Sequence, residues 1–323
     1  NIAAVGVGGV GATNVSNVSS QNIVALCDVD HNYAAGTFEK YPGAKIYKDY
    51  RKMFDEMGDQ IDAVIVATSD HTHALIAAQA MRMGKHVYVQ KPLTHSVFES
   101  RLLAQLATET QVATQMGNQG NSHDGIRQTC EWIWDGAIGD VSEVHAWTNR
   151  PIWPQGLERP SDTPPVPETL AWDLFIGPAP YRPYNPIYTP WNWRAWWDFG
   201  TGALGDMGCH ILDPAFWALN LGHPGSFQGS SSQVNTESAP IASTVQYEFP
   251  DRGNIGKIKL PALKLTWYDG GLLPPRPEEL KDGQIMGDHS GGILFIGTKG
   301  KLMTGCYGRN PILLPEEMDM DYK

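Results

Sequence analysis

Asp206 and His210 are the two side chains whose types and spacing best suit proton transfer. They stand four residues apart in the run Gly205-Asp206-Met-Gly-Cys-His210-Ile-Leu-Asp213, so a helix would place them on one face and within reach of each other. A histidine titrates near neutral pH and can take up and return a proton, while a neighbouring carboxylate orients its ring and favours its charged form. A lone histidine on a helix is more often structural, but the Asp partner and the preceding glycine-rich run (residues 200–205) favour a catalytic pair.

A glycine-rich turn close to the N-terminus has the GxGxxG spacing of dinucleotide-binding loops. The motif occupies residues 6–11, directly after the apolar strand Ile2–Val5 and before an expected helix. This context supports a dinucleotide-binding loop, for which the motif alone would be weak evidence. Its first glycine permits a tight turn, its second lets the backbone approach a pyrophosphate, and its third allows close helix–sheet packing. The helix N-terminus then offers free N–H groups to the phosphates. We therefore expect a dinucleotide to contact Gly6, Gly8, Gly9, Val10 and Gly11.

Asp28 directly follows the second apolar strand, about twenty residues after the glycine motif. A carboxylate at that place accepts hydrogen bonds from the adenine ribose hydroxyls and repels a 2′-phosphate. Neither Asp28 nor the three residues after it is an arginine. The sequence therefore predicts NAD as the cofactor in preference to NADP. The alternative is that Asp28 only caps the following helix.

Two further strand ends should lie at the same edge of the sheet, where ligands of such folds bind. They read Thr68-Ser69-Asp70-His71-Thr72-His73 and Gln90-Lys91-Pro92. Two histidines two apart suggest a metal, but on a turn their rings need not converge and no third ligand is nearby, so we expect none. Gly117-Asn118-Gln119 follows the last strand and could place amides over a substrate. The expected cofactor contacts are Thr68, Ser69, His71, Gln90 and Lys91, and the expected substrate contacts are Lys91, Asn118, Gln119 and His210.

The first 120 residues alternate short apolar runs with helical periodicity. Apolar strands joined by helices predict a parallel sheet covered on both faces, and right-handed crossovers make it doubly wound. We therefore predict an α/β protein whose residues 1–120 form a Rossmann domain. The expected strands are Ile2–Val5, Ile23–Cys27, Ala44–Tyr47, Ala63–Ala67, His86–Gln90 and Val112–Met116, and the expected helices include Leu75–Met83 and Val97–Thr108.

Residues 121–323 have a different pattern and are predicted to form one α/β domain for substrate binding and oligomerisation. Adjacent strands without intervening helices indicate a large, mostly antiparallel open sheet. The expected helices are Gly125–Trp134 and Asp206–Leu219, and the expected strands are Val141–Thr148, Ser226–Glu237, Thr244–Phe249, Lys257–Trp267, Ile293–Gly297 and Lys301–Thr304.

A segment rich in Pro and Trp, residues 149–200, interrupts this domain and favours a carbohydrate ligand. Tryptophan offers a flat apolar face to sugar C–H groups and an N–H donor to hydroxyls. Any single one of them is more often packed in a loop or an oligomer interface, so none is predicted to be catalytic. The candidates are Trp147, Trp153, Trp191, Trp193, Trp196 and Trp197.

Composition narrows the class of protein. A length of 323 residues, 41% hydrophobic and 18% charged, indicates a globular protein of two domains. The formal charge of −11 argues against nucleic acid as a partner, and no apolar run approaches the ~20 residues of a membrane span. Four scattered cysteines predict free thiols. We expect a cytoplasmic or periplasmic protein, since a removed export signal would be compatible with a start at Asn1.

The motifs taken together resemble one family of oxidoreductases. The strand with its GxGxxG turn, the Gln90-Lys91-Pro92 run and the Asp206-x-Gly208-x-His210-x-x-Asp213 run resemble, in this order and over essentially the whole chain, the Gfo/Idh/MocA family, which includes glucose–fructose oxidoreductase and inositol dehydrogenase. The resemblance implies an NAD(P)-dependent dehydrogenase acting on a secondary hydroxyl of a sugar, glycoside or cyclitol. It also implies that Lys91, Asp206 and His210 are the catalytic set, and that the sheet face forms a homodimer or homotetramer.

The sequence departs from the family pattern in two places and leaves two other functions open. Gln90 stands where the family usually has Glu, which removes a charge near the nicotinamide. Relatives with this Trp-rich segment continue beyond Lys323, so we expect closing elements of the sheet, and with them site contacts, to lie in a longer chain. One alternative is an NAD-dependent glycosidase of the same family that oxidises its substrate transiently and eliminates a glycosyl group. The other is a non-catalytic sensor of NAD or sugar.

Overall fold

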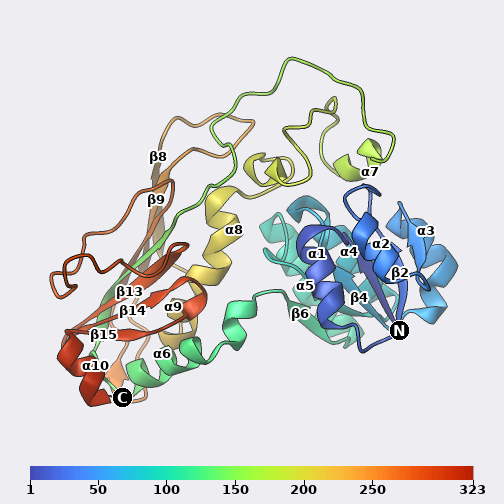
Figure 1. The fold of residues 1–323 in the computed structure, drawn as a ribbon. Helices are drawn as coiled ribbons and strands as arrows, with labels where there is room; N and C mark the ends of the chain where they lie inside the picture. The colour runs from blue at the N-terminus through green and yellow to red at the C-terminus, as the bar shows by residue number, and fades with distance from the viewer. Residues whose placement is uncertain (323) are drawn as a thin grey trace. The chain divides into compact units, whose positions relative to one another are not determined.

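The computed structural model describes residues 1–322, which its contacts divide into two compact units (Figure 1). The first unit comprises Asn1–Gly117 and Glu158–Thr201, and the second comprises Asn118–Leu157 and the residues from Gly202 onward. These units differ from the contiguous domains 1–120 and 121–323 expected from the sequence, because residues 158–201 make their contacts with the N-terminal unit.

Six parallel strands form the sheet of the first unit. Their order is that of a Rossmann fold, in which ligands bind at the point where the strand order reverses, here between β1 and β4. The predicted doubly wound sheet is thus confirmed. In sheet order the strands are β3 (Lys45–Tyr47), β2 (Ile23–Cys27), β1 (Ile2–Val5), β4 (Ala63–Val66), β5 (His86–Val89) and β6 (Thr114–Met116).

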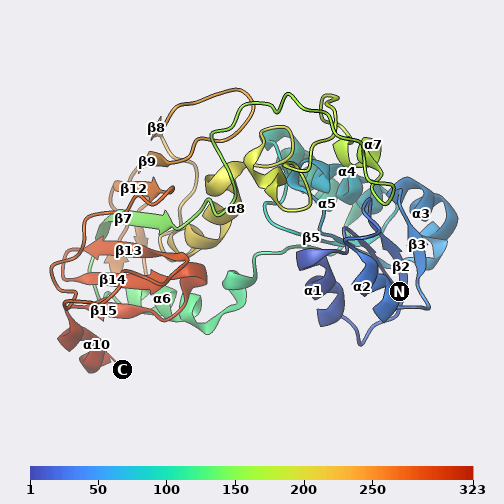
Figure 2. The ribbon, with the colours of Figure 1, turned by 45° about the horizontal axis from the view of Figure 1, so that its top comes forward.

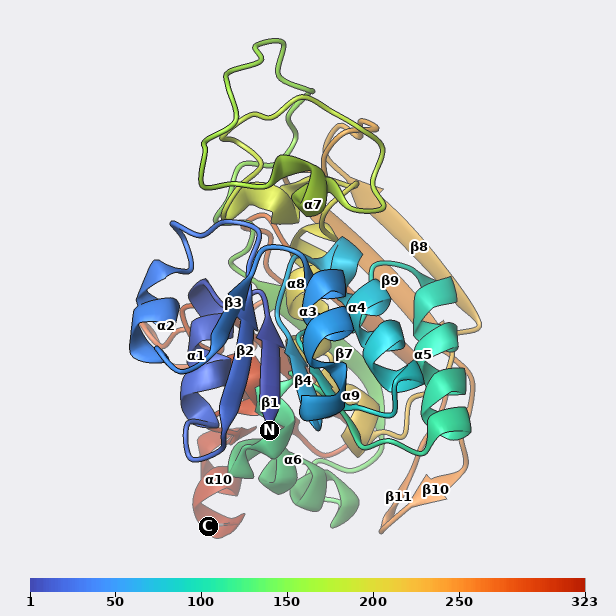
Figure 3. The same ribbon diagram turned by 90° about the vertical axis from the view of Figure 1, so that its right-hand side faces the viewer.

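Helices cover both faces of this sheet because alternate residues of each buried strand point to opposite sides. Ala4 of β1 packs in a cluster with α1 (Gly9–Asn17) and the residues beside α2 (Ala35–Lys40). Its neighbours Ala3 and Val5 pack with the helices of the other face, which are α3 (Tyr50–Met57), α4 (Asp70–Arg82) and α5 (Val97–Thr110). Figure 3 shows α1 and α2 on one side of the strands and α3, α4 and α5 on the other.

Residues 158–201 are joined to the Rossmann sheet by backbone hydrogen bonds. Asp30, just after β2, forms a β-bridge with Leu170. On either side, the Ala171 N–H donates to the Val29 carbonyl at 2.8 Å and the His31 N–H donates to the Thr169 carbonyl at 3.2 Å. The segment contains the short helices α7 (Trp172–Ile176) and η3 (Asn192–Ala195). Main-chain pairing of this kind carries no side-chain pattern, so the sequence did not indicate it.

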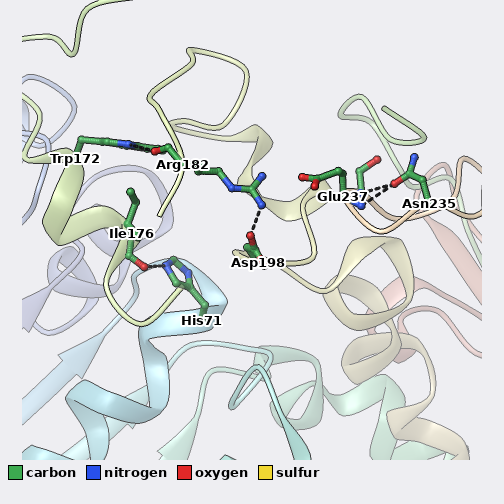
Figure 4. Close-up of polar contacts among 8 residues, drawn as sticks. His71, Trp172, Ile176, Arg182, Asp198, Asn235 and Glu237 are labelled. Atoms are coloured by element: carbon green, nitrogen blue, oxygen red, sulfur yellow. Dashed lines mark hydrogen bonds and ion pairs between the residues drawn. The ribbon is translucent and has the colours of Figure 1, made fainter. Parts of the chain in front are cut away.

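The aromatic residues of this segment surround two buried polar side chains. The Arg182 guanidinium pairs with Asp198 and lies 5.2 and 5.1 Å from the ring centres of Tyr188 and Phe199. His71 of α4 is also buried, and its Nε2 donates to the carbonyls of Phe175 (2.9 Å) and Ile176 (3.2 Å). Figure 4 shows His71 directed at Ile176, and Arg182 bonded to both Trp172 and Asp198. The segment is therefore packed around these groups.

Seven strands form the sheet of the second unit, and Figure 2 shows most of them in order from β15 to β8. Five of the six pairings are antiparallel and the pairing of β7 with β12 is parallel. The predicted large, mostly antiparallel open sheet is confirmed. In sheet order the strands are β15 (Ile312–Leu314), β14 (Lys301–Gly305), β13 (Gly291–Gly297), β7 (Val141–Thr148), β12 (Leu263–Tyr268), β9 (Ser243–Phe249) and β8 (Ser226–Ser231); β10 (Asn254–Ile255) and β11 (Ile258–Lys259) form a separate hairpin.

One face of this sheet is covered by α6 (Asp124–Trp134), α8 (Gly202–Ile211) and α9 (Asp213–Ala218). Apolar side chains from all three helices form one buried cluster with inward-facing residues of the strands, among them Trp267 and Phe295. The other elements of this unit are η2 (Gln119–Ser122), η4 (Cys306–Gly308) and α10 (Glu316–Tyr322). The buried cluster fixes α8, which carries Asp206 and His210, against the sheet.

Prolines explain two differences between the predicted and observed elements. The single helix expected over Asp206–Leu219 is two helices, and Pro214 in the first turn of α9 accounts for the break because it has no N–H for a continuing helix. The strand expected over Lys257–Trp267 is divided into β11 and β12 around Pro261 for the same reason. The strand expected over Ser226–Glu237 ends at Ser231, short of the predicted end.

No helix within residues 1–322 is both long and apolar enough to cross a bilayer. The four cysteines are free, as predicted, and three of them are buried.

The burial of His71 generates a prediction about acid stability. Desolvation lowers its pKa from 6.5 to about 4, so the unfolded chain binds this proton more readily than the folded chain. The stability contributed by neutral His71 is complete above pH 6.5 and is lost as the pH falls toward 4. Urea unfolding followed by tryptophan fluorescence should show an unfolding free energy that falls by about 1 kcal/mol per pH unit over this window. His71→Gln, which keeps a donor but does not titrate, should be less stable at pH 7 and show a shallower slope. Equal slopes would contradict the assignment.

Candidate functional site

The glycine motif forms a turn that only glycine can make. Gly6 has a φ of +77°, in the region that side chains disfavour. At Gly11, a Cβ atom would lie 1.8 Å from the Gly6 carbonyl oxygen, so α1 could not approach the turn if this residue had a side chain. Helix α1 begins at Gly9, and its first N–H groups face outward from the turn as a site for an anion. The structure therefore has the backbone cradle that the motif predicts.

Asp28 binds this turn through one carboxylate oxygen and its own loop through the other. Oδ2 accepts from the N–H groups of Val7 (2.8 Å) and Gly8 (3.2 Å), and Oδ1 accepts from that of Asp30 (2.9 Å). The side chain is only 8% exposed, and burial raises the pKa of its carboxyl while the three backbone hydrogen bonds oppose that rise. Oδ1 accepts a single N–H and keeps lone-pair capacity for a further donor, so the residue fits a ribose hydroxyl as well as the turn.

Tyr33 is part of the same loop and was not predicted from the sequence. Its ring lies against the glycine turn, since a Cβ built on Gly8 would fall 2.1 Å from the ring and one built on Gly9 would fall 2.4 Å from the hydroxyl. Burial raises the pKa of the Tyr33 hydroxyl, and the nearby Arg194 charge opposes that rise. The Arg194 guanidinium lies 4.0 and 4.2 Å from the ring centres of Trp191 and Trp193. Only tertiary packing brings these side chains to the turn, so no sequence motif marks them.

His73 links the two predicted strand ends that follow β4 and β5. Its ring is buried, with Nδ1 2.8 Å from the Pro92 carbonyl and Nε2 3.0 Å from the Thr68 carbonyl. Burial lowers the pKa of this imidazole, and the two carbonyls oppose that effect. Lys91, the residue before Pro92, is thereby held beside the turn that contains Thr68 and Ser69. His73 was considered from the sequence only as half of a His-x-His pair.

The other residues predicted to contact the cofactor have the following surroundings. Gln90 is buried; its Nε2 donates to Asn14 of α1 at 3.0 Å and its Oε1 accepts from the Lys91 N–H at 3.2 Å. The contacts of His71 with Phe175 and Ile176 give it a packing role, and its predicted contact with a cofactor stays a prediction. The described residues contain no group of three or more His, Cys, Asp or Glu side chains that could hold a metal ion.

The second unit brings His210 together with Asn118, which the sequence placed among the substrate contacts. His210 is 2% exposed, and its Nδ1 lies 2.7 Å from Asn118 Oδ1. The Tyr307 ring meets the imidazole edge to face, with ring centres 4.6 Å apart. Tyr307 has a φ of 64°, an uncommon backbone conformation for a residue with a side chain. This residue was missed because it comes from the distant C-terminal part of the chain.

Two carboxylates accompany His210 on neighbouring helical turns. Asp206 lies one turn earlier on α8 and is 6% exposed, and its charge contributes to raising the Tyr307 pKa, after burial and Cys306. Asp213 begins α9 and accepts from the Asn121 side-chain amide at 2.9 and 3.2 Å. The predicted Asp206–His210 pair is thus in one buried region, with Asn118 and Tyr307 beside the imidazole.

Most of the tryptophans proposed to face a sugar are buried. Trp147, Trp153, Trp193 and Trp196 are all below one tenth exposed, and the Trp153 N–H donates to Gln155. Only Trp191 (41%) and Trp197 (39%) present substantial surface to solvent.

Comparisons with known proteins agree with both units. Residues 1–118 match the GFO_IDH_MocA model, described as an oxidoreductase family with an NAD-binding Rossmann fold, and residues 138–256 match the model of the family's C-terminal α/β domain. The structure of GenD2 from gentamicin A biosynthesis in complex with NAD superposes with a TM-score of 0.65 at 20% identity, over 94% of this chain and 71% of that one. That likeness shows a shared fold.

Curated relatives align over shorter stretches. Inositol 2-dehydrogenase 2 of Saccharopolyspora erythraea is 35% identical over 97 residues, which are 29% of this chain and 28% of that protein. Glycosyl hydrolase family 109 protein 1 of Akkermansia muciniphila is 29% identical over 152 residues, which are 43% of this chain and 31% of that protein. The chain thus spans less than a third of the length of either relative. The two family models match in order along the chain and agree with the motifs and folds described above, so the protein belongs to the Gfo/Idh/MocA oxidoreductase family and its residues 1–118 are an NAD-binding Rossmann domain.

Proposed function

We propose that this protein is an NAD-dependent dehydrogenase that oxidises a secondary hydroxyl of a sugar, glycoside or cyclitol. The observation that carries the proposal is the buried imidazole of His210, whose Nδ1 is engaged by Asn118 Oδ1. Because that oxygen is an acceptor, Nδ1 bears the hydrogen and Nε2 keeps the lone pair that a general base needs. The inositol dehydrogenase among the relatives supports this substrate class.

NAD, when bound, supplies the hydride acceptor of the reaction. In the proposed mechanism His210 Nε2 takes the proton of the substrate hydroxyl. The Lys91 ammonium donates a hydrogen bond to the same oxygen and stabilises its developing negative charge. Asp206, one turn from His210 on α8, offsets the charge of the protonated ring. The proposal thus requires Lys91 and His210 to act on one oxygen atom.

The residues after β2 bear on the identity of the cofactor, and strand β8 bears on the oligomeric state. Asp28 and Asp30 after β2 would repel a 2′-phosphate, which supports NAD over NADP.

Strand β8 is exposed along its whole length at the edge of the second sheet, and edge strands are surfaces that proteins cover. We propose a homodimer or homotetramer formed through this sheet, in the cytoplasm or the periplasm.

A second function is favoured by the Akkermansia relative, which is named as a glycosyl hydrolase. The same cofactor and base would serve an NAD-dependent glycosidase, in which the oxidised substrate would lose the glycosidic leaving group, take up water and be reduced again by the bound NADH. A panel of sugars, cyclitols and aryl glycosides distinguishes the two functions. A dehydrogenase accumulates NADH absorbance, whereas the glycosidase releases the aglycone with no net NADH. Binding of NAD with no turnover of any compound would contradict both and favour a sensor.

Replacing His210 with Ala should abolish the general base. We expect kcat on the best substrate of the panel to fall by roughly 10²–10⁴-fold, with the dissociation constant of NAD, measured by calorimetry, changed by less than about threefold. His223→Ala, an exposed histidine of the same unit, is the matched control and should keep full activity. Unchanged turnover in His210→Ala would rule out the assigned base.

Replacing Gly8 with Ala should weaken NAD binding. A second substitution separates a clash with Tyr33 from a clash with the pyrophosphate. The added Cβ would fall 2.1 Å from the Tyr33 ring and would also face the approaching pyrophosphate. We expect the dissociation constant for NAD to rise at least about tenfold. In Gly8→Ala/Tyr33→Ala the ring clash is absent, so thermal stability should recover while NAD affinity stays low. Recovery of affinity in the double variant would show that Gly8 serves only to accommodate Tyr33.

A further inference from the structure

One polar partner of the His210 ring comes from outside its own helix. Asn118, directly before the short helix η2, places its Oδ1 2.7 Å from His210 Nδ1. Both side chains are below one tenth exposed, so water is a poor substitute for either partner. Leaving such a buried group without its partner is therefore unfavourable.

The orientation of the Asn118 amide is set by Asp213. The Asp213 carboxylate is an acceptor, and it receives the Asn121 amide at 2.9 and 3.2 Å. Burial raises the pKa of Asp213, while hydrogen bonds from the side chains of Asn121 and Asn118 oppose that rise. The Asn118 amide acts on this carboxylate as a donor in the same electrostatic sense, and an amide with Nδ2 toward Asp213 has Oδ1 toward His210. The amide therefore has one consistent orientation.

Tyr307 closes the other side of the imidazole. Its ring stands at 70° to that of His210. Its Cβ atom lies close to Gly120, since a Cβ built on Gly120 would fall 3.1 Å from it. The charged groups around this pair are Asp206 from α8, Asp213 from α9, and Arg150 and Arg309, whose charges act on the Tyr307 hydroxyl. An aromatic ring and an amide thus both contact the imidazole.

We propose that Asp213, Asn118 and His210 form a hydrogen-bond chain in which Asn118 is a positioning residue that fixes the Nδ1–H tautomer of His210. The inference rests on the proposed function in one respect, namely that His210 is the base. A neutral amide between carboxylate and imidazole orients the ring but keeps the full negative charge away from Nδ1. The ring therefore returns its proton more readily than it would with a carboxylate in direct contact.

The tautomer can be observed without any substrate. Two-bond ¹H–¹⁵N correlation spectra of the full chain labelled with ¹⁵N-histidine distinguish the Nδ1–H form from the Nε2–H form. The signals of His210 are those lost in His210→Gln. We expect the Nδ1–H form in the wild type and a mixture of both forms in Asn118→Leu, which removes the acceptor at similar volume. An Nε2–H form in the wild type, or an unchanged spectrum in Asn118→Leu, would overturn the proposal.

A reciprocal exchange separates positioning from mere packing. In Asn118→Asp/Asp213→Asn the total charge is kept and the acceptor for Nδ1–H is restored, but the carboxylate now touches the imidazole. We expect kcat to fall roughly 10²-fold in Asn118→Leu and to return to within about tenfold of the wild type in the exchanged variant. The acid limb of its kcat/KM pH profile should move to higher pH by about one unit.

Two controls make the outcome decisive. Ser122→Ala alters an exposed side chain in the same turn and should change neither the spectrum nor the pH profile. If the exchanged variant folds, as judged by circular dichroism, but is no more active than Asn118→Leu and its tautomer is not restored, positioning by Asn118 is disproved. If no variant and not even the wild type oxidises any substrate, the proposed function fails, while the spectra still decide the tautomer.

Discussion

The hydrogen bond between His210 and Asn118 is the constraint on which the site depends. A buried imidazole needs a partner for each nitrogen that carries a hydrogen, and a neutral ring can carry that hydrogen on either nitrogen. In the proposed mechanism, Asn118 binds Nδ1 and so assigns the proton transfer to Nε2. Three other features act on this contact: Asp213 acts on the amide, the Tyr307 ring packs against the imidazole, and the apolar cluster beneath α8 fixes the backbone.

Buried polar side chains of the first unit also have hydrogen-bond partners, but these partners are main-chain groups. Asp28 holds the glycine turn through the N–H groups of Val7 and Gly8 and accepts a third N–H from Asp30, and His73 joins the strand ends after β4 and β5 through two carbonyls. Such bonds lock a loop without filling the space above it with side chains. A dinucleotide needs that open backbone, because its phosphates bind to N–H groups. The polar side chains of this unit therefore shape the cofactor site largely by holding its loops.

The sequence predicted those features whose chemistry is local. The GxGxxG turn, Asp28 after β2, the Rossmann sheet and the placement of Asp206 and His210 on one helix all follow from spacing or periodicity. It did not predict the return of residues 158–201 to the first unit, because main-chain hydrogen bonds such as Ala171 to Val29 have no side-chain signature. Asn118 was expected at the substrate. Its contact with His210 spans 92 positions and depends on how η2 packs, which periodicity does not encode.

The buried tryptophans change the grounds for the functional assignment. Because four of the six candidate tryptophans are buried, the aromatic content no longer supports a sugar substrate. The functional assignment therefore depends on His210 as the base. Transient oxidation followed by elimination would need a second proton acceptor, for the carbon beside the newly oxidised one. Tyr307 contacts the His210 ring, but burial raises the pKa of its hydroxyl, so it keeps its proton at neutral pH. Asp213 is directed at two amides. Neither Tyr307 nor Asp213 is therefore suited to accept that second proton.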